Sequence, residues 1–292
     1  AEASAVFWEQ NSREEILARV SMTKAAPFVL EKMAKTERFR DVKLWGYVND
    51  ISEEEQSQFA VMCAGLPDGS IYVSFRGTDN TITGWREDFN MGYLSETPGQ
   101  LKAVSYVEQM LGDGSCSVRI GGPGFRRDIV ESAAYQRVLP KIHTILPESS
   151  IVGMLLEHQE AYEVVRSSNS GIQQHDAMSW EVLGTSFVYV REVAAQSLML
   201  DETMKAWIYQ LNGEEREQIV DTVFGMLEAA DIKTVDDFYH SKWKAVQELM
   251  KAKSRLPEKS QKVFAKALKL LWSEGNKTVR KTVKQVVGEK RR

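Results

Sequence analysis

Short apolar runs separated by polar turns predict several strands in the first 200 residues. Residues 71–75 (Ile-Tyr-Val-Ser-Phe) follow the turn Pro67-Asp68-Gly69 and lead to Gly77, a pattern that is typical of a buried strand entering a loop. Residues 59–64 form a second apolar run, and the turn between the two runs predicts a hairpin. Further strands are predicted at residues 39–48, 117–120 and 162–165.

Helical spacing dominates two other parts of the chain. Residues 101–111 repeat apolar side chains at helical intervals. After Asp201 the composition becomes helical, with Asn212-Gly213 as a break and Pro257 in a first helical turn. We therefore divide the chain into residues 1–200, which hold the strands, and a helical C-terminal region, residues 201–292. The helices of that region are predicted at residues 203–211, 214–230, 235–251 and 258–271.

Charge is distributed unevenly along the 292 residues. The net charge is −4, yet residues 241–292 hold sixteen Lys/Arg against four Asp/Glu. We interpret this as a basic helical tail beside an acidic body, with the apolar stripe of residues 263–271 packed on the protein. The alternative is a basic amphipathic helix that lies on an anionic membrane surface. Nucleic acid is the less favoured partner.

Several classes of protein are excluded by composition. The content of 43% hydrophobic and 27% charged residues is ordinary for a globular protein. No run approaches the roughly 18 apolar residues of a membrane span, and the polar, acidic start is not a signal peptide. Cys63 and Cys116 form neither a disulfide framework nor a metal-binding spacing. We therefore expect a cytoplasmic protein without a metal or cofactor.

Candidate chemistry lies where the strand at residues 71–75 ends. Ligands of open α/β sheets bind beyond the carboxyl ends of strands, which is the position of Arg76, Gly77 and Thr78. Gly77 permits close approach of the backbone, and Thr78 offers an N–H and a hydroxyl to a developing oxyanion. The simpler interpretation is a strand that ends in a polar turn.

The residues Phe75-Arg76-Gly77-Thr78, followed by Trp85 and Asp88-Phe89, resemble the class 3 (fungal-type) lipases. The chain is more closely similar to a bacterial lipase-like family of the α/β-hydrolase type, over roughly residues 28–187. This resemblance implies an α/β fold, with an α/β-hydrolase-like, mainly parallel sheet flanked by helices. It also implies that Thr78 is the oxyanion residue and that residues 80–89 form a lid.

The nucleophile of such a family is missing from this sequence. α/β-Hydrolases carry Gly-x-Ser-x-Gly between a strand and a helix, whereas this chain reads Ile120-Gly121-Gly122-Pro123-Gly124 and has no such motif anywhere. By this resemblance, three elements are absent between Gly121 and Pro123: the turn that carries the nucleophile (the nucleophile elbow), the helix that follows it and the next strand. Either the sequence joins two pieces across an omitted segment, or the protein lacks it. An omitted segment predicts a break of about 5–15 Å at residues 121–123, the spacing of near strands in a sheet.

A histidine loop gives the second point of resemblance. His175, shortly before Trp180-Glu181-Val182, resembles the catalytic-His loop of these lipases. By that match His175 is the general base, a role suited to imidazole because its pKa lies near neutrality. The ordinary interpretation is a hydrogen-bonded loop histidine. Ser150 stands where the lipases carry their catalytic Asp, so the triad acid is not assigned, and Glu148 is a weak substitute. The remaining histidines, His143, His158 and His240, are interpreted as structural or exposed.

The resemblance implies a serine hydrolase of the lipase/esterase type that acts on a carboxylic ester or related acyl substrate. His175 would be the base and Thr78 would lie in the oxyanion hole, within about 15 Å of each other, while the serine itself is absent. The alternative is a non-catalytic, α/β-hydrolase-like protein with a binding or scaffolding role.

Overall fold

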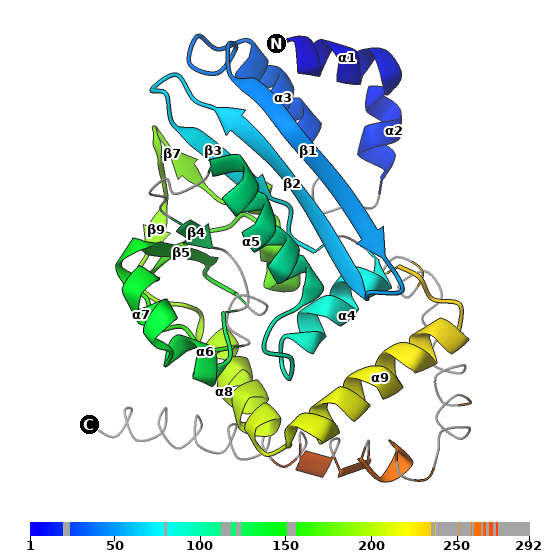
Figure 1. Cartoon of the computed structure of the whole chain (residues 1–292). Coiled ribbons are helices and arrows are strands. Elements are labelled where there is room, and N and C mark those ends of the chain that lie inside the picture. Colours follow the sequence, from blue (N-terminus) through cyan, green and yellow to red (C-terminus); the bar gives the residue numbers. More distant parts are fainter. Residues whose placement is uncertain are drawn as a thin grey trace.

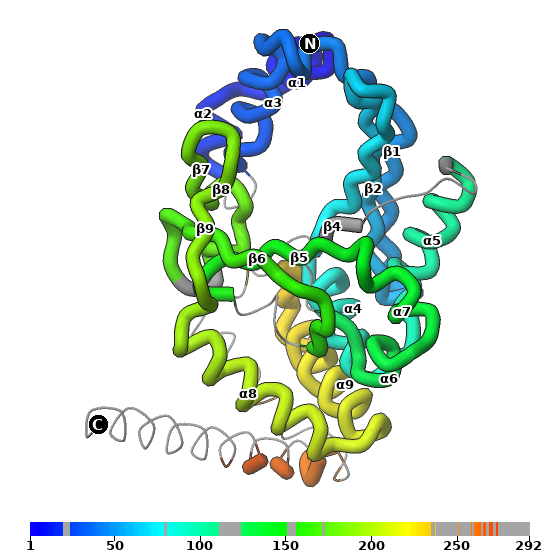
Figure 2. Tube along the Cα trace, turned by 90° about the vertical axis from the view of Figure 1, so that its left-hand side faces the viewer, coloured from blue at the N-terminus to red at the C-terminus, as the bar shows by residue number. Residues whose placement is uncertain are grey.

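The computed structural model describes residues 1–19, 24–78, 81–111, 118–120, 124–150 and 156–234, together with isolated positions of the C-terminal segment: 237, 251, 258, 260–263, 265–266, 269–270 and 273. Three small sheets lie between helices at both ends of the molecule (Figures 1 and 2). The N-terminal helices are at one end of the longest sheet, and the helices after residue 194 are at the other.

Three short helices open the chain: α1 (Glu2–Gln10), α2 (Arg13–Ala18) and α3 (Ala26–Ala34). Ser12 begins α2 by accepting a hydrogen bond from the backbone N–H of Glu15, which satisfies one of the free donors of a helix start. The guanidinium of Arg13 lies 4.5 Å from the centre of the Trp8 ring and 2.9 Å from the Glu31 carboxylate. This side chain therefore joins α1, α2 and α3.

The first sheet is antiparallel, with the order β1-β2-β3. It consists of β1 (Lys43–Ser52), β2 (Ser57–Gly65) and β3 (Ile71–Phe75). The predicted hairpin is confirmed, because β2 pairs antiparallel with β3. On one face, Phe59, Val61 and Cys63 pack against Tyr106 of α5 (Pro98–Leu111), which lies along that face (Figure 2). The alternation of side chains along β2 directs its other residues to the opposite face.

Helix α4 (Ile82–Asn90) occupies the predicted lid and is tied to α9 (Gly213–Ala229). The guanidinium of Arg86 lies 2.6 Å from Asp221 and 3.0 Å from Glu228, both in α9. The rings of Phe89 and Phe224 also meet edge to face, with centroids 5.6 Å apart.

The second sheet has the order β4-β5-β6-β9. Its strands β4 (Val118–Ile120), β5 (Ile142–Pro147) and β6 (Tyr162–Val165) are parallel, and β9 (Tyr189–Val190) is antiparallel to β6. The connection from β4 to β5 contains α6 (Arg127–Val130), α7 (Ala133–Val138) and the turn η1 (Leu139–Lys141). Val130, Tyr135 and Ile142 form the core between this connection and the sheet.

The prediction of an α/β-hydrolase-like, mainly parallel sheet is wrong. Among the described residues, parallel pairing is confined to β4, β5 and β6, and the first sheet is wholly antiparallel. The physical reason lies in the connections. Only a few residues separate β1 from β2 and β2 from β3, and such short links permit antiparallel pairing alone, because a parallel neighbour requires a crossover of about a dozen residues or more.

The predicted boundary at residue 201 falls inside α8 (Ala195–Tyr209), which meets α9 at the capped turn Asn212-Gly213 (Figure 1). Leu211 and Ile219 form a small core against which Val263 and Leu270 pack. Val263, a member of the predicted apolar stripe, therefore contacts the protein, whereas Leu270 was not assigned to that stripe. Phe264, Leu268 and Leu271 lie outside the described residues, and the membrane-surface alternative stays a prediction. No helix in the described part of the chain is both long and apolar enough to cross a membrane.

Candidate functional site

The loop after β3 holds Thr78 through a hydrogen bond to α4. The Thr78 hydroxyl donates to Oδ2 of Asp88 at 2.5 Å. Burial raises the pKa of Asp88 to about 6, the bond from Thr78 acts to lower it, and the nearby Glu87 raises it. The hydroxyl that was predicted to face an oxyanion is thus bonded to a half-buried carboxyl group of the protein.

The loop that carries His175 is fixed to the end of β5. The backbone N–H of Ser149 donates to Oε1 of Gln174 at 2.7 Å, and Nε2 of Gln174 donates to the carbonyl of Asn169 at 2.8 Å. The indole N–H of Trp180 donates to the carbonyl of Gln174 at 2.9 Å. Gln174 is buried, so this one amide side chain positions the short helix η3 (Gly171–His175) beside the strand end.

His175 itself is exposed at the end of η3. Partial desolvation by the surrounding loop lowers its pKa below the usual 6.5, while the charge of Asp176 acts to raise it. The ring is therefore mainly neutral at pH 7, the state that a general base requires.

Thr78 and His175 are anchored to different sheets. Thr78 follows β3 and bonds to α4, whereas the His175 loop bonds to the end of β5. Their convergence on one substrate remains a prediction. Ser150, at the expected position of the triad acid, is buried and its N–H donates to the carbonyl of Pro147. Residues 121–123, where the break was predicted, lie outside the described residues, as do Cys116 and His240.

A buried polar cluster on the second sheet was not predicted from the sequence. The carboxylate of Glu160 accepts hydrogen bonds from the hydroxyls of Tyr135 (2.5 Å) and Thr144 (2.7 Å), and lies 2.6 Å from Nδ1 of His158. Burial acts to raise the pKa of Glu160, but the bonds from Tyr135, His158 and Thr144 outweigh it and lower the pKa to about 2. His158 is thus structural, as predicted, and His143 is exposed.

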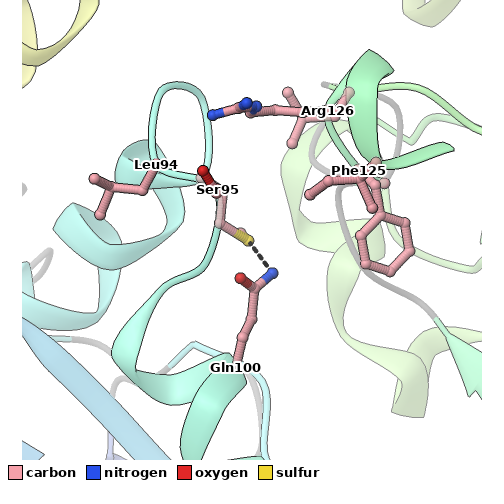
Figure 3. Close-up of a pocket in the computed structure, with 9 residues that line it drawn as sticks. Leu94, Ser95, Gln100, Phe125 and Arg126 are labelled. Carbon is pink, nitrogen blue, oxygen red and sulfur yellow. Dashed lines mark hydrogen bonds between the residues drawn. The ribbon is translucent and has the colours of Figure 1, made fainter. Parts of the chain in front are cut away.

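A small pocket lies between the loop after α4 and the start of α6. Leu94, Ser95 and Gln100 approach it from one side, and Phe125 and Arg126 from the other (Figure 3). Only about 10 Å³ of it is open to the centre of a water molecule, which is about the room that one water needs. This pocket is therefore a poor candidate for a substrate site.

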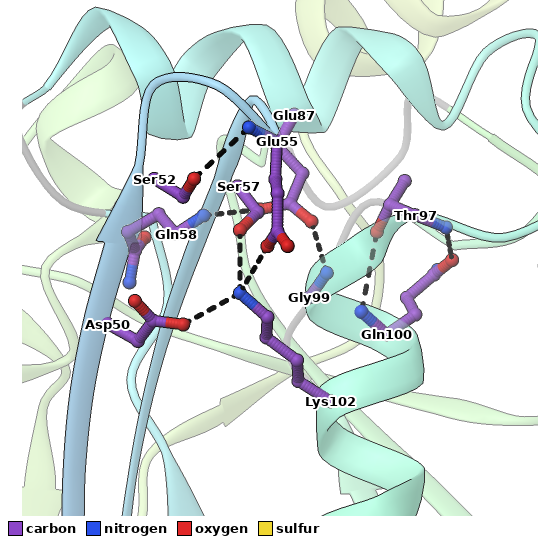
Figure 4. Close-up of polar contacts among 10 residues, drawn as sticks. All are labelled: Asp50, Ser52, Glu55, Ser57, Gln58, Glu87, Thr97, Gly99, Gln100 and Lys102. Carbon is purple, nitrogen blue, oxygen red and sulfur yellow. Dashed lines mark hydrogen bonds and ion pairs between the residues drawn. The ribbon is translucent and has the colours of Figure 1, made fainter.

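A second polar cluster holds the first sheet to α4 and α5. The buried carboxylate of Glu87 accepts hydrogen bonds from the backbone N–H groups of Gln58 (2.7 Å) and Gly99 (2.6 Å). Nearby, the ammonium of Lys102 lies 2.7 Å from Asp50 and 2.8 Å from Glu55 (Figure 4). A Cβ on Gly99 would lie 2.6 Å from Oε1 of Glu87, so a larger residue there would displace this carboxylate. These contacts are architectural, and no group of three His, Cys, Asp or Glu side chains within the described ranges could hold a metal ion.

The fold defines a mixed protein of small, separate sheets and surrounding helices. The sequence model of the Mbeg1-like family matches residues 33–122 and 115–225. Because these matches together cover more than half of the chain, the chain belongs to the Mbeg1-like family. No curated protein and no solved structure matches it.

The family match corrects the resemblance drawn from the sequence. No lipase or α/β-hydrolase family matches, so the assignment to a lipase-like, α/β-hydrolase family is wrong. The sequence motifs around Thr78 and His175 are short, and both lie within the residues that match the Mbeg1-like family. The two matched segments overlap at residues 115–122. This overlap includes Gly121 and Gly122, where the nucleophile elbow of a hydrolase is absent from the sequence.

Proposed function

We propose that this chain is a non-catalytic protein with a binding or scaffolding role. The observation that carries the proposal is the bond from the Thr78 hydroxyl to Asp88. An oxyanion hole needs donors that point at an empty position where charge develops, and this hydroxyl points at a carboxyl group of its own chain. The lack of a Gly-x-Ser-x-Gly motif in the sequence supports the same conclusion.

A binding role is also supported by the surface of the first sheet. Tyr47 is 67% exposed and Tyr72 is 54% exposed, although both are large side chains in strands. Leu44 and Tyr72 are both paired with Ala64 of β2 and so share one face, and apolar side chains that share an exposed face are characteristic of interaction sites. The other large apolar side chains exposed on this sheet are Leu44, Trp45, Val48, Ile51, Ile71 and Phe75.

Hydrolysis of an acyl ester is the second candidate, and one observation favours it. His175 is exposed and its pKa is lowered, so the ring could accept a proton at neutral pH. A nucleophile would still be needed, and the motif that supplies it in such enzymes is missing from the sequence.

Ester hydrolysis by the purified full chain separates the two candidates. The substrates are p-nitrophenyl acetate and butyrate, and the variants are His175→Ala and, as a matched control, the exposed His143→Ala. A non-catalytic chain gives the same slow rate for all three proteins. A rate that falls by about 100-fold or more in His175→Ala alone, the usual effect of losing a general base, would contradict the proposal.

We also propose a cytoplasmic location. Cys63 is a free, buried cysteine, and free thiols are usual in a reducing compartment. Thiol labelling of the protein in intact cells under denaturing quench tests this, because a reduced Cys63 would react and an oxidised one would not.

A further inference from the structure

Arg216 of α9 is a partly buried cation to which no carboxylate in the described part of the chain is paired. Its Nε donates to the carbonyl of Ile208 at 2.9 Å, and its Nη1 donates to the carbonyl of Gly92 at 3.0 Å. Burial lowers the pKa of Arg216, the nearby Tyr209 acts to raise it, and the charge of Arg126 lowers it. Because a charge that is removed from water is costly unless it is paired, this guanidinium lacks the counter-charge that such groups usually have.

Arg126 lies beside Arg216 and already has a carboxylate. Its Nη1 donates to the carbonyl of Tyr93 at 2.6 Å, and its guanidinium forms an ion pair with Asp128. Gly92 and Tyr93 are consecutive residues, so the two arginines bind neighbouring carbonyls of the loop after α4. Figure 3 shows Arg126 extended from the start of α6 toward this loop.

Arg127 is the third arginine of this cluster, and it too is paired. Its guanidinium lies 3.0 Å from the Glu157 carboxylate, and its Cζ lies 4.3 Å from the centre of the Tyr209 ring. The Cζ of Arg216 lies 5.8 Å from the centre of the same ring. The three arginines therefore share two carboxylates, those of Asp128 and Glu157, which leaves the charge of Arg216 in excess.

The excess charge is accessible from solvent. Tyr209 is 38% exposed, and the side chain of Arg127 is 57% exposed. A guanidinium carries five N–H donors, and the carbonyls of Ile208 and Gly92 accept from Nε and Nη1 of Arg216. Nη2 of Arg216 bonds to no described residue and is not among the buried polar atoms that lack a partner, so it is open to solvent. An anion from solution can therefore reach the donors of this group.

We propose that Arg216, with Arg126 beside it, binds the carboxylate group of a small organic acid. A guanidinium binds a carboxylate through two parallel N–H···O bonds, which add geometric specificity to the charge attraction. One negative charge compensates the excess at Arg216, whereas a phosphate monoester would bring about −1.5 to −2 charges at pH 7. A carboxylate therefore fits this cluster better than a phosphate group does. This inference goes beyond the proposed function and does not depend on it.

The test is a titration of the full chain with sodium acetate, in which sodium chloride keeps the ionic strength constant. Saturation-transfer NMR on the acetate methyl group reports binding, and inorganic phosphate serves as the competitor. We expect saturable binding with a Kd on the order of 1–10 mM, which is reasonable for a ligand of so few atoms. Phosphate should displace acetate only at concentrations above this Kd.

Two variants change the binding in opposite directions. Arg216→Lys keeps the charge but removes the planar fork, so it should weaken acetate binding by about tenfold. Arg137→Lys is the matched control, because Arg137 is an exposed arginine of α7, and it should bind acetate like the unaltered chain. Asp128→Asn removes the carboxylate paired with Arg126 and should tighten binding by about threefold or more, since a competing negative charge is lost. A gain in affinity cannot arise from misfolding.

Four results would each overturn the proposal. The first is the absence of saturable acetate binding by the unaltered chain up to about 100 mM, where a specific site would be filled. The second is unchanged acetate binding in Arg216→Lys, and the third is a failure of Asp128→Asn to bind acetate more tightly. The fourth is displacement of acetate by phosphate at concentrations below the acetate Kd, which would assign the cluster to phosphate groups instead.

Discussion

The hydroxyl of Thr78 donates a 2.5 Å hydrogen bond to Oδ2 of Asp88, and this bond joins the loop after β3 to α4. Asp88 is half-buried, and burial raises its pKa to about 6 from the ordinary 3.8. The native state therefore holds a proton on Asp88 that the unfolded chain would release between these two pH values.

Replacement of Asp88 by Asn should remove a pH dependence of stability. The raised pKa of Asp88 stabilises the native state fully below pH 3.8, and this contribution is lost as the pH rises through about 6. Asparagine stays neutral and can still accept from Thr78. We expect Asp88→Asn to be more stable than the unaltered chain above pH 6, by about 2 kcal/mol, and equally stable near pH 4. Urea unfolding from pH 4 to pH 8 measures this, and parallel profiles for the two proteins would contradict it.

Glu160 should act in the opposite sense. Its lowered pKa of about 2 stabilises the native state above pH 4.5, and this contribution is lost as the pH falls through 2. Glutamine has a single acceptor oxygen, so it cannot accept from Tyr135 at one end of the group and from Thr144 and His158 at the other. Glu160→Gln should therefore cost about 3 kcal/mol at pH 7, as expected when buried partners lose a charged acceptor, and should flatten the loss of stability in acid. A steep acid slope that persists in this variant would show that another group is responsible.

Arg86 should contribute measurably to stability because it joins α4 to α9. Its side chain is 14% exposed and pairs with both Asp221 and Glu228. Arg86→Ala should lower the free energy of unfolding by about 1–2 kcal/mol, since hydrogen bonds to charged groups and packing of the stem are lost together. Lys35→Ala is the matched control. The Lys35 side chain is 72% exposed in its pair with Glu31, and removal of such a pair should cost about 0.5 kcal/mol or less. Equal losses of unfolding free energy in the two variants would show that Arg86 does not stabilise the contact between α4 and α9.

Local patterns in the sequence were sufficient for elements whose partners are close in the chain. The hairpin of β2 and β3 and the helix α5 were predicted because alternation, turn residues and helical spacing are local signals. The arrangement of the sheets was not predictable in this way. It depends on whether β3 and β4 belong to the same sheet, and no pattern in residues 71–120 specifies that.

The polar clusters show the same limit for the candidate site. His158 and Glu160 are two residues apart, but Thr144 and Tyr135 reach them only because the β4–β5 connection folds back on the sheet. The prediction for Thr78 failed to include Asp88, ten residues away, because the two meet only when α4 folds back on the loop after β3. The resemblance to lipases rested on short sequence motifs. Such motifs indicate a local turn, but they do not identify the family.

Covalent labelling by a fluorophosphonate tests the central claim of a non-catalytic protein most directly. This reagent phosphonylates a serine only where a neighbouring base activates it, so no knowledge of the natural substrate is required. The full chain and His175→Ala are incubated with the reagent at pH 7.5 and analysed by intact mass spectrometry. We predict that neither protein gains an adduct. One adduct per chain in the unaltered protein, absent from His175→Ala, would contradict the account and establish a serine hydrolase.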